Sequence, residues 1–161
     1  MSGTVPTTAS RAGARLGCVL VDPVASPLNA WTSRSTRWNV VGPNFRDIHL
    51  NLDEVVGITI AETDEVAERM HTINTVLDRR PTTVTSMIIV PATPEGEVLT
   101  NDSITYIMSS IEAMVATRLR GIHDDVDGGE DATSGGILED LIGKLEQQAW
   151  FLSSKIRHPM Q

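Results

Sequence analysis

His49 and Asp53 are the first residues whose types and spacing could do chemistry, and Asp64 and Glu68 repeat the spacing of four. On a helical wheel Asp53, Asp64 and Glu68 fall at about 40°, 60° and 100° from His49. All four residues therefore share one flank of the helix. One imidazole with three carboxylates suits Fe(II), Mn(II) or Zn(II) better than a thiolate site or a calcium loop does. These four residues therefore form a candidate metal site.

A single copy of the helix cannot close this site. His49 and Asp64 are separated by about 22 Å along a helix axis, whereas bonds in one metal centre are roughly 2.0 to 2.5 Å long. A two-fold axis crossing the helix near Gly57 and Ile58 would place the His49 end of one copy opposite the Asp64 end of another. The alternative is that these side chains are ordinary solvent-exposed acids beside a structural histidine, since Asp and Glu are common on exposed helices.

Runs of apolar residues at helical spacing define the elements that must carry these side chains. They predict helices at about 44–74, 101–122 and 136–157, with a first helix from about Ala14. Pro23 and Pro27 predict a kink or break in the first helix, because each removes a backbone donor at a cost of roughly 3 kcal/mol or more. The expected buried stripes include Phe45, Ile48, Leu52, Val55, Val56, Val66, Met70 and Ile73 in the second helix, and Leu138, Leu141, Leu145, Leu152 and Ile156 in the fourth.

Residues 79–100 hold three prolines and a short apolar run, which predicts an irregular crossover with room for one short element. Four helices with a long crossover between the second and third predict an all-α four-helix bundle that is not a simple up-and-down bundle. No strand pattern competes with it. We expect the bundle domain over residues 14–158, after a flexible N-terminal tail of residues 1–13 that is too polar to order itself.

Charge and composition narrow the classes of function. The chain has 13 basic and 21 acidic residues, a formal net charge of −8, and a single cysteine. This excess of negative charge disfavours non-specific binding of nucleic acid and suits a surface that attracts cations. One cysteine cannot form an intrachain disulfide, and the N-terminus lacks the apolar run of a signal peptide or membrane span. We therefore expect a soluble, cytoplasmic protein with no membrane partner.

The stretch RWNVVGPNFRDIHLNLDEVVGITIAETDEVAERM, residues 37–70, resembles the Dps proteins, mini-ferritins named for DNA protection in starved cells. The family hallmark is His-Trp-Asn-Val, then Gly-x-x-Phe, a His-x3-Asp pair and Asp-x3-Glu-Arg. The bundle plan, the crossover and Trp150 extend a weaker likeness to residue 157. The resemblance implies a ferritin-like four-helix bundle and a hollow shell of twelve subunits, with a ferroxidase centre at each two-fold interface.

By position, the resemblance implies that one subunit supplies His49 and Asp53 and its partner supplies Asp64 and Glu68, with Glu68 the main iron ligand. Trp38 matches the family's indole beside the centre. The implied reaction is oxidation of Fe(II), preferably by hydrogen peroxide, with storage of ferric mineral and protection against oxidative damage. Twelve such subunits would carry a charge of about −96, a sink for cations. The Gly-rich acidic loop HDDVDGGEDATSGG, which follows the predicted third helix, would line a three-fold pore through His123, Asp124, Asp125, Asp127, Glu130 and Asp131. The alternative for these side chains is a solvated helix end with turn residues.

Arg37 stands where the family has a metal-binding histidine. A guanidinium stays protonated and does not ligate metals in the ordinary way. Arg37 is expected either to salt-bridge Asp64 or Glu68 across the interface or to point away. The alternative function is therefore a non-catalytic shell, or a nucleoid-associated protein. The low lysine content disfavours a nucleoid-associated protein. Near the N-terminus the chain offers only Arg11 and Arg15, so we expect weak DNA binding that moderate salt abolishes.

Overall fold

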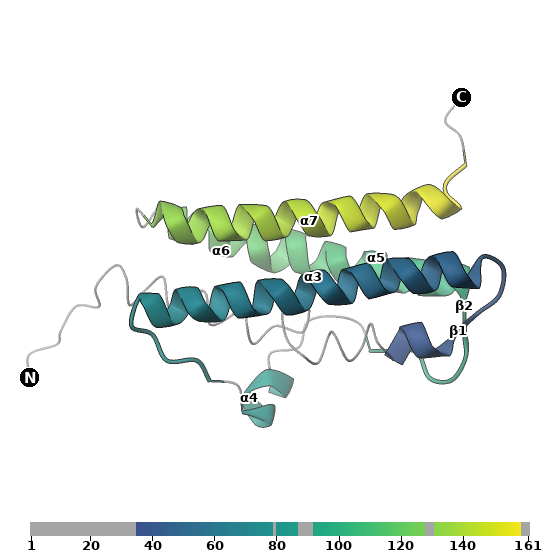
Figure 1. Ribbon diagram of the computed structural model, residues 1–161, viewed down its shortest axis with the longest axis horizontal. Helices are drawn as coiled ribbons and strands as arrows, with labels where there is room; N and C mark the ends of the chain where they lie inside the picture. Colours follow the sequence, from purple (N-terminus) through teal and green to yellow (C-terminus); the bar gives the residue numbers. More distant parts are fainter. Residues whose placement is uncertain (1–34, 79, 87–91, 128–130, 159–161) are drawn as a thin grey trace, which may run out of the picture.

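The computed structural model describes residues 35–78, 80–86, 92–127 and 131–158. Within these ranges three long helical rods lie along one axis, with α7 packed against both α3 and α5 (Figure 1). The predicted tail and the predicted first helix, with Pro23 and Pro27, lie outside the described residues. None of the described helices is long and apolar enough to cross a membrane.

The helix that carries the candidate site is α3 (Phe45–Thr72), which has 28 residues and is about 42 Å long. It confirms the predicted second helix to within two residues at each end. A helical turn at residues 35–39 and the short strand β1 (Val40–Val41) precede it. The turn between β1 and α3 contains Gly42 with φ of +115°, a conformation that side chains with a Cβ atom rarely adopt.

A two-residue parallel strand pair fixes the relative direction of two rods. β1 pairs with β2 (Val98–Leu99), with Val40 opposite Val98. β1 leads into α3 and β2 leads directly into α5, so these two helices begin at the same end of the bundle. The crossover at residues 73–97 therefore returns along the bundle, and its short helix α4 (Pro81–Ser86) lies to one side in Figure 1. The expectation of no strand was wrong, because two-residue strands leave no periodic pattern.

The third rod is continuous but has three parts. They are α5 (Thr100–Met114), the π-helical turn η1 (Val115–Leu119) and α6 (Arg120–Asp127). The predicted end near Ile122 was wrong, because the helix continues for more than one further turn. Ile122 and Val126 are four residues apart and both are buried, so one more apolar contact holds this turn against the bundle.

The last rod is α7 (Ala132–Ile156), which begins four residues before its predicted start. Polar contacts join α7 to α3 along the length of both helices. As the residue number of the α3 partner increases, that of the α7 partner decreases. The two helices are therefore antiparallel. In order along α3, the contacts of this α3–α7 ladder pair Asp47 with Lys155, Glu54 with Gln148, Glu62 with Lys144, and Arg69 with Asp131 and Ser134.

Apolar side chains of the three rods form one buried cluster. Most of the predicted stripe is buried, but Phe45 and Ile156 are exposed. Both are the terminal residue of a helix. The most deeply buried large side chains are Ile48, Leu52, Met70, Ile104, Met114, Leu119, Leu138, Leu141, Leu145 and Leu152.

Candidate metal centre

His49 and Asp53 lie together in the first two turns of α3. His49 Nε2 is 3.9 Å from Asp53 Oδ2, and the two side chains are 30% and 43% exposed. Two donors that bind one ion at about 2.0 to 2.2 Å can stand up to about 4.2 Å apart. The separation therefore fits two ligands of one ion, on a side of the helix that a second molecule can reach.

The orientation of the His49 ring favours metal binding through Nε2. His49 Nδ1 lies 3.3 Å from the backbone carbonyl oxygen of Arg37. A carbonyl oxygen only accepts hydrogen bonds, so Nδ1 carries the proton and donates it. With Nδ1 as the donor, the nitrogen left to bind a metal is Nε2, on the side of Asp53. Metal-binding histidines are held in the same way, with the second nitrogen donating to a carbonyl or a carboxylate.

Arg37 occupies the other side of the Asp53 carboxylate. Its Nη1 donates to Asp53 Oδ1 and forms an ion pair with it. The guanidinium therefore uses one ligand oxygen and places a positive charge beside the pair, which opposes the approach of a cation. The expected salt bridge of Arg37 to Asp64 or Glu68 across the interface stays a prediction, because it involves a second subunit. Within the chain, the turn before α3 folds Arg37 back over Asp53, and Arg37 Nε is buried with no hydrogen-bond partner among the described residues.

The other predicted ligands lie further along the same helix. Asp64 and Glu68 are both exposed side chains of α3, and one straight helix cannot bring them to His49. Trp38 is also exposed, and the Arg37 guanidinium carbon lies 5.9 Å from the centroid of its ring. The structure thus brings together half of the predicted site and leaves the other half pointing outward.

The flank of α3 between these two halves is unusually apolar for an exposed surface. Leu50 and Ile60 are 48% and 43% exposed. Gly57 lies between them, and a Cβ atom built there would meet nothing within 4 Å. On the wheel Leu50, Gly57 and Ile60 fall at about 100°, 80° and 20° from His49, which is within the arc of the four candidate ligands.

Comparison with known proteins places this geometry in a family. The family model of the ferritin-like domain matches residues 32–159 of this chain. The chain belongs to the ferritin-like family. Its resemblance to Dps proteins is also confirmed: it is 27% identical over 127 residues to the DNA protection during starvation protein of Mycolicibacterium smegmatis, covering 78% of this chain and 67% of that protein.

Solved Dps structures have the same fold. Dps from Microbacterium arborescens in the high iron form superposes with a TM-score of 0.84 at 27% identity, covering 97% of this chain and 99% of that one. Dps from Mycobacterium smegmatis, in its tetragonal form, gives 0.85 at 22% identity, covering 98% and 94%. These matches confirm the predicted ferritin-like four-helix bundle. Membership of the ferritin-like family and the likeness to Dps proteins support iron storage and a ferroxidase-type function in general.

The acidic segment expected at the Dps pore is partly helical. His123 lies between two carboxylates, with Nε2 3.1 Å from Glu139 and Nδ1 3.5 Å from Asp124. These acids contact opposite nitrogens of the ring, so they do not converge on one ion. Asp131 is committed to Arg69 at 2.7 Å and to the start of α7, while residues 128–130 lie outside the described residues.

A second group of carboxylates was not predicted. Ligand atoms of Glu62, Glu65 and Asp140 lie within 4.8 Å of one another. Lys144 contacts two of them, and hydrogen bonds to Asp140 and Glu62 raise the pKa of its amine above the ordinary value. The sequence did contain a signal for Glu62. On the helical wheel of α3 this residue falls within about 60° of the centre of the apolar stripe, where a carboxylate is unexpected. No sequence spacing reveals its proximity to Asp140.

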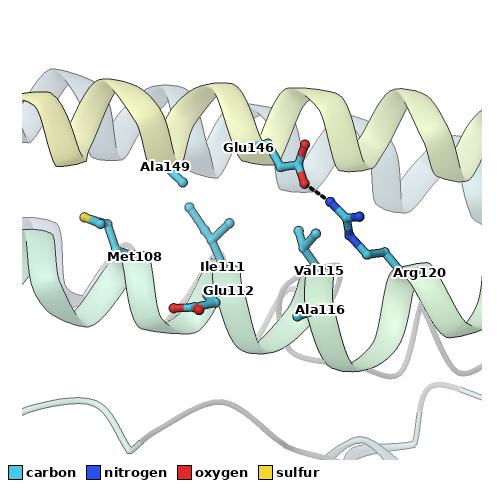
Figure 2. A pocket seen from close by; sticks show the side chains of 8 residues that line it. All are labelled: Met108, Ile111, Glu112, Val115, Ala116, Arg120, Glu146 and Ala149. Atoms are coloured by element: carbon cyan, nitrogen blue, oxygen red, sulfur yellow. Dashed lines mark hydrogen bonds and ion pairs between the residues drawn. The ribbon is translucent and has the colours of Figure 1, made fainter.

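The bundle also has a pocket of about 540 Å³. Its lining includes none of the interface candidates and none of Glu62, Glu65 and Asp140. Figure 2 shows it between the third rod and α7, where Met108, Ile111 and Val115 supply apolar walls. The ion pair of Arg120 with Glu146 lies at one end. None of the residues that line it belongs to α3, so this pocket takes no part in the candidate metal centre.

Proposed function

We propose that this chain assembles into a homo-oligomeric shell, a dodecamer by family resemblance, that oxidises Fe(II) at its two-fold interfaces and stores the ferric product. Each centre combines His49 and Asp53 of one subunit with Asp64 and Glu68 of the next. Hydrogen peroxide is the preferred oxidant. The observation that carries this proposal is the His49–Asp53 pair, whose Nε2 and Oδ2 atoms stand 3.9 Å apart with the ring held by a backbone carbonyl.

The exposed flank of α3 supports the two-fold contact. An antiparallel copy brings the two halves of the site together only if the helices approach closely near their midpoint. Gly57 permits that approach because it has no side chain, and Leu50 and Ile60 give an isologous contact apolar surface to bury. The same contact would cover the exposed indole of Trp38 beside the centre.

The proposed reaction takes one electron from each of two Fe(II) ions. Peroxide accepts both electrons, its O–O bond breaks, and two hydroxide ions form or, with protons, two water molecules. Two Fe(III) ions remain and hydrolyse into mineral. The residues bind and orient the ferrous ions, and the shared site holds them near one oxidant molecule. Peroxide and free ferrous iron, which together damage cells, are consumed in the same step.

Arg37 supports a second candidate function. Its ion pair with Asp53 supplies a fixed positive charge where a metal would bind. If this pair persists at the assembled interface, the protein is a storage shell that depends on oxidation elsewhere. Both lysines already contact carboxylates of α3, which supports the prediction of weak DNA binding and disfavours a nucleoid-binding role.

The test is anaerobic loading of the assembled protein with Fe(II), followed by stoichiometric hydrogen peroxide and a record of ferric absorbance. We compare the unmodified protein with Arg37→His, Glu68→Ala and Glu95→Ala. Glu95 is an exposed acid of the crossover outside the site, so Glu95→Ala removes the same charge as Glu68→Ala. We expect Glu68→Ala to slow oxidation at least tenfold, about 1.4 kcal/mol in activation free energy, and Glu95→Ala to leave the rate unchanged.

Arg37→His separates the two candidate functions. Replacing the guanidinium frees Asp53 and adds an imidazole, so a working centre should oxidise iron faster in this variant. An unmodified protein no faster than Glu68→Ala, together with a fast Arg37→His variant, would show that Arg37 silences a competent site. If all four proteins oxidised iron at the same rate, the proposed interface centre would be wrong.

A further inference from the structure

The middle step of the α3–α7 ladder has the largest excess of negative charge, since the step of Glu54 and Gln148 has only one carboxylate without a cation. At the ends, Lys155 balances Asp47, and Arg69 balances Asp131. At Glu62, by contrast, three carboxylates meet one ammonium group. The group therefore carries two excess negative charges, with Glu62 buried and Glu65 and Asp140 exposed at the edge of the two helices.

The carboxylates of this middle step are arranged as ligands. One oxygen from each of Glu62, Glu65 and Asp140 lies within 4.8 Å of the others. Oxygens bound to one ion at about 2.1 to 2.4 Å can be separated by up to about 4.8 Å. The three groups come from two helices that other contacts already hold together, so the arrangement does not depend on a mobile loop.

Glu62 gives a second and independent sign of a missing partner. The residue is 2% exposed. Its Oε1 accepts from Lys144 Nζ at 2.5 Å, but its Oε2 is buried and has no hydrogen-bond partner in the part of the chain that the structure describes. The neighbouring buried threonines differ, because Thr59 and Thr63 donate to carbonyls of their own helix. A buried carboxylate oxygen without a partner is costly, and a bound cation removes that cost.

We propose that Glu62, Glu65 and Asp140 bind one divalent cation inside each subunit, at a site separate from the two-fold interface. The charge of such an ion equals the excess left by three carboxylates and one ammonium group. A ligand set made only of carboxylates selects hard cations such as Mn(II), Mg(II) or Ca(II). On the wheel of α3, Glu62 and Glu65 fall at about 220° and 160° from His49, away from the arc of the interface ligands.

Lys144 is a built-in competitor at this site. Its ammonium contacts Glu62 and Asp140, two of the three ligands. The cation must share these carboxylates or displace the ammonium toward solvent, where the side chain is already 40% exposed. Removing this charge should therefore strengthen cation binding, whereas removing a carboxylate should weaken it.

The test uses Mn(II) as the probe, with the free ion counted by its electron paramagnetic resonance signal. The assembled protein carries Glu68→Ala, so the interface centre is already weakened. Into this background we introduce Asp140→Asn, Glu62→Gln, Lys144→Met and, as the matched control, Glu95→Ala. We expect the background and the control to bind one Mn(II) per subunit with equal affinity. Asp140→Asn and Glu62→Gln should bind it at least tenfold more weakly, and Lys144→Met should bind it more tightly.

Thermal unfolding gives a second readout on the same proteins. Without metal, Lys144→Met should lower Tm, because both oxygens of Glu62 then lack a partner. Adding Mn(II) should raise the Tm of Lys144→Met by more than that of the background protein, since binding to the folded state stabilises it. Equal Mn(II) affinity in the background, Asp140→Asn and Lys144→Met would overturn the site. This result is independent of iron oxidation, which reports only on the interface centre.

Discussion

At the scale of single residues, the structure brings one pair of candidate ligands together with a group that competes for one of them. His49 is held as a metal ligand would be, yet the guanidinium of Arg37 pairs with Asp53. The sequence revealed the replacement of histidine by Arg37, but it could not identify the partner. That choice depends on the turn after β1, which brings residue 37 back over residue 53.

The ion pair itself should add little to stability. Arg37 and Asp53 side chains are 19% and 43% exposed, and pairs reached by solvent contribute roughly 0 to 1 kcal/mol. We expect Arg37→Gln to change the free energy of unfolding in urea by less than about 1 kcal/mol, and the change to shrink further in high salt. A loss of several kcal/mol, with Glu95→Ala unchanged, would instead give Arg37 a structural role.

At the scale of elements, the helices were predictable and their junctions were not. The periodicity of α3 and α7 was strong because their buried residues recur every three or four positions. The extra turn of α6 was missed because its acidic residues resemble a loop, although Val126 continues the buried stripe. The strand pair and the Glu62–Asp140 group were missed because both depend on tertiary contacts.

The start of α7 depends on one cap. Asp131 accepts hydrogen bonds from the backbone N–H and the hydroxyl of Ser134 and pairs with Arg69. We expect Asp131→Ala to lower the free energy of unfolding by about 0.5 to 2 kcal/mol. Asp131→Asn should cost less, because an amide oxygen still caps the helix. Urea unfolding at neutral pH measures both variants, and equal values for Ala and Asn would contradict a role in capping.

The contribution of Asp131 should also depend on pH. Burial alone would raise the pKa of this carboxyl, but hydrogen bonds from Ser134 and the pair with Arg69 bring it below the ordinary value of 3.8. A depressed pKa in the folded state stabilises the protein above the ordinary pKa, and this stability is lost as pH falls through the folded value. The difference between the unmodified protein and Asp131→Asn should therefore be constant near neutrality and shrink below pH 3.8.

At the scale of the whole molecule, the proposed function requires assembly, because the two halves of the centre share one flank of α3 but lie about 22 Å apart along it. Family membership and the bundle could be predicted from the pattern at residues 37–70 together with the long crossover. The contact that completes the centre involves a second chain, so neither the sequence nor the fold of one subunit contains it. Its support is the exposed flank of α3, where Leu50, Gly57 and Ile60 lie among the candidate ligands.

A charge on that flank should therefore separate the subunits and stop iron oxidation together. We expect Ile60→Asp to abolish the dodecamer, since an isologous contact would place two such carboxylates near each other in an apolar interface. Val76→Asp is the matched control, because Val76 is 87% exposed and lies beyond the end of α3. Light scattering after size exclusion should give the unmodified protein and the control a mass of about 210 kDa, twelve times the 17.5 kDa chain. Ile60→Asp should give a much smaller species that keeps its helical circular dichroism but oxidises Fe(II) no faster than Glu68→Ala. An intact shell that oxidises iron normally in Ile60→Asp would place the two-fold contact, and with it the metal centre, on another face of the bundle.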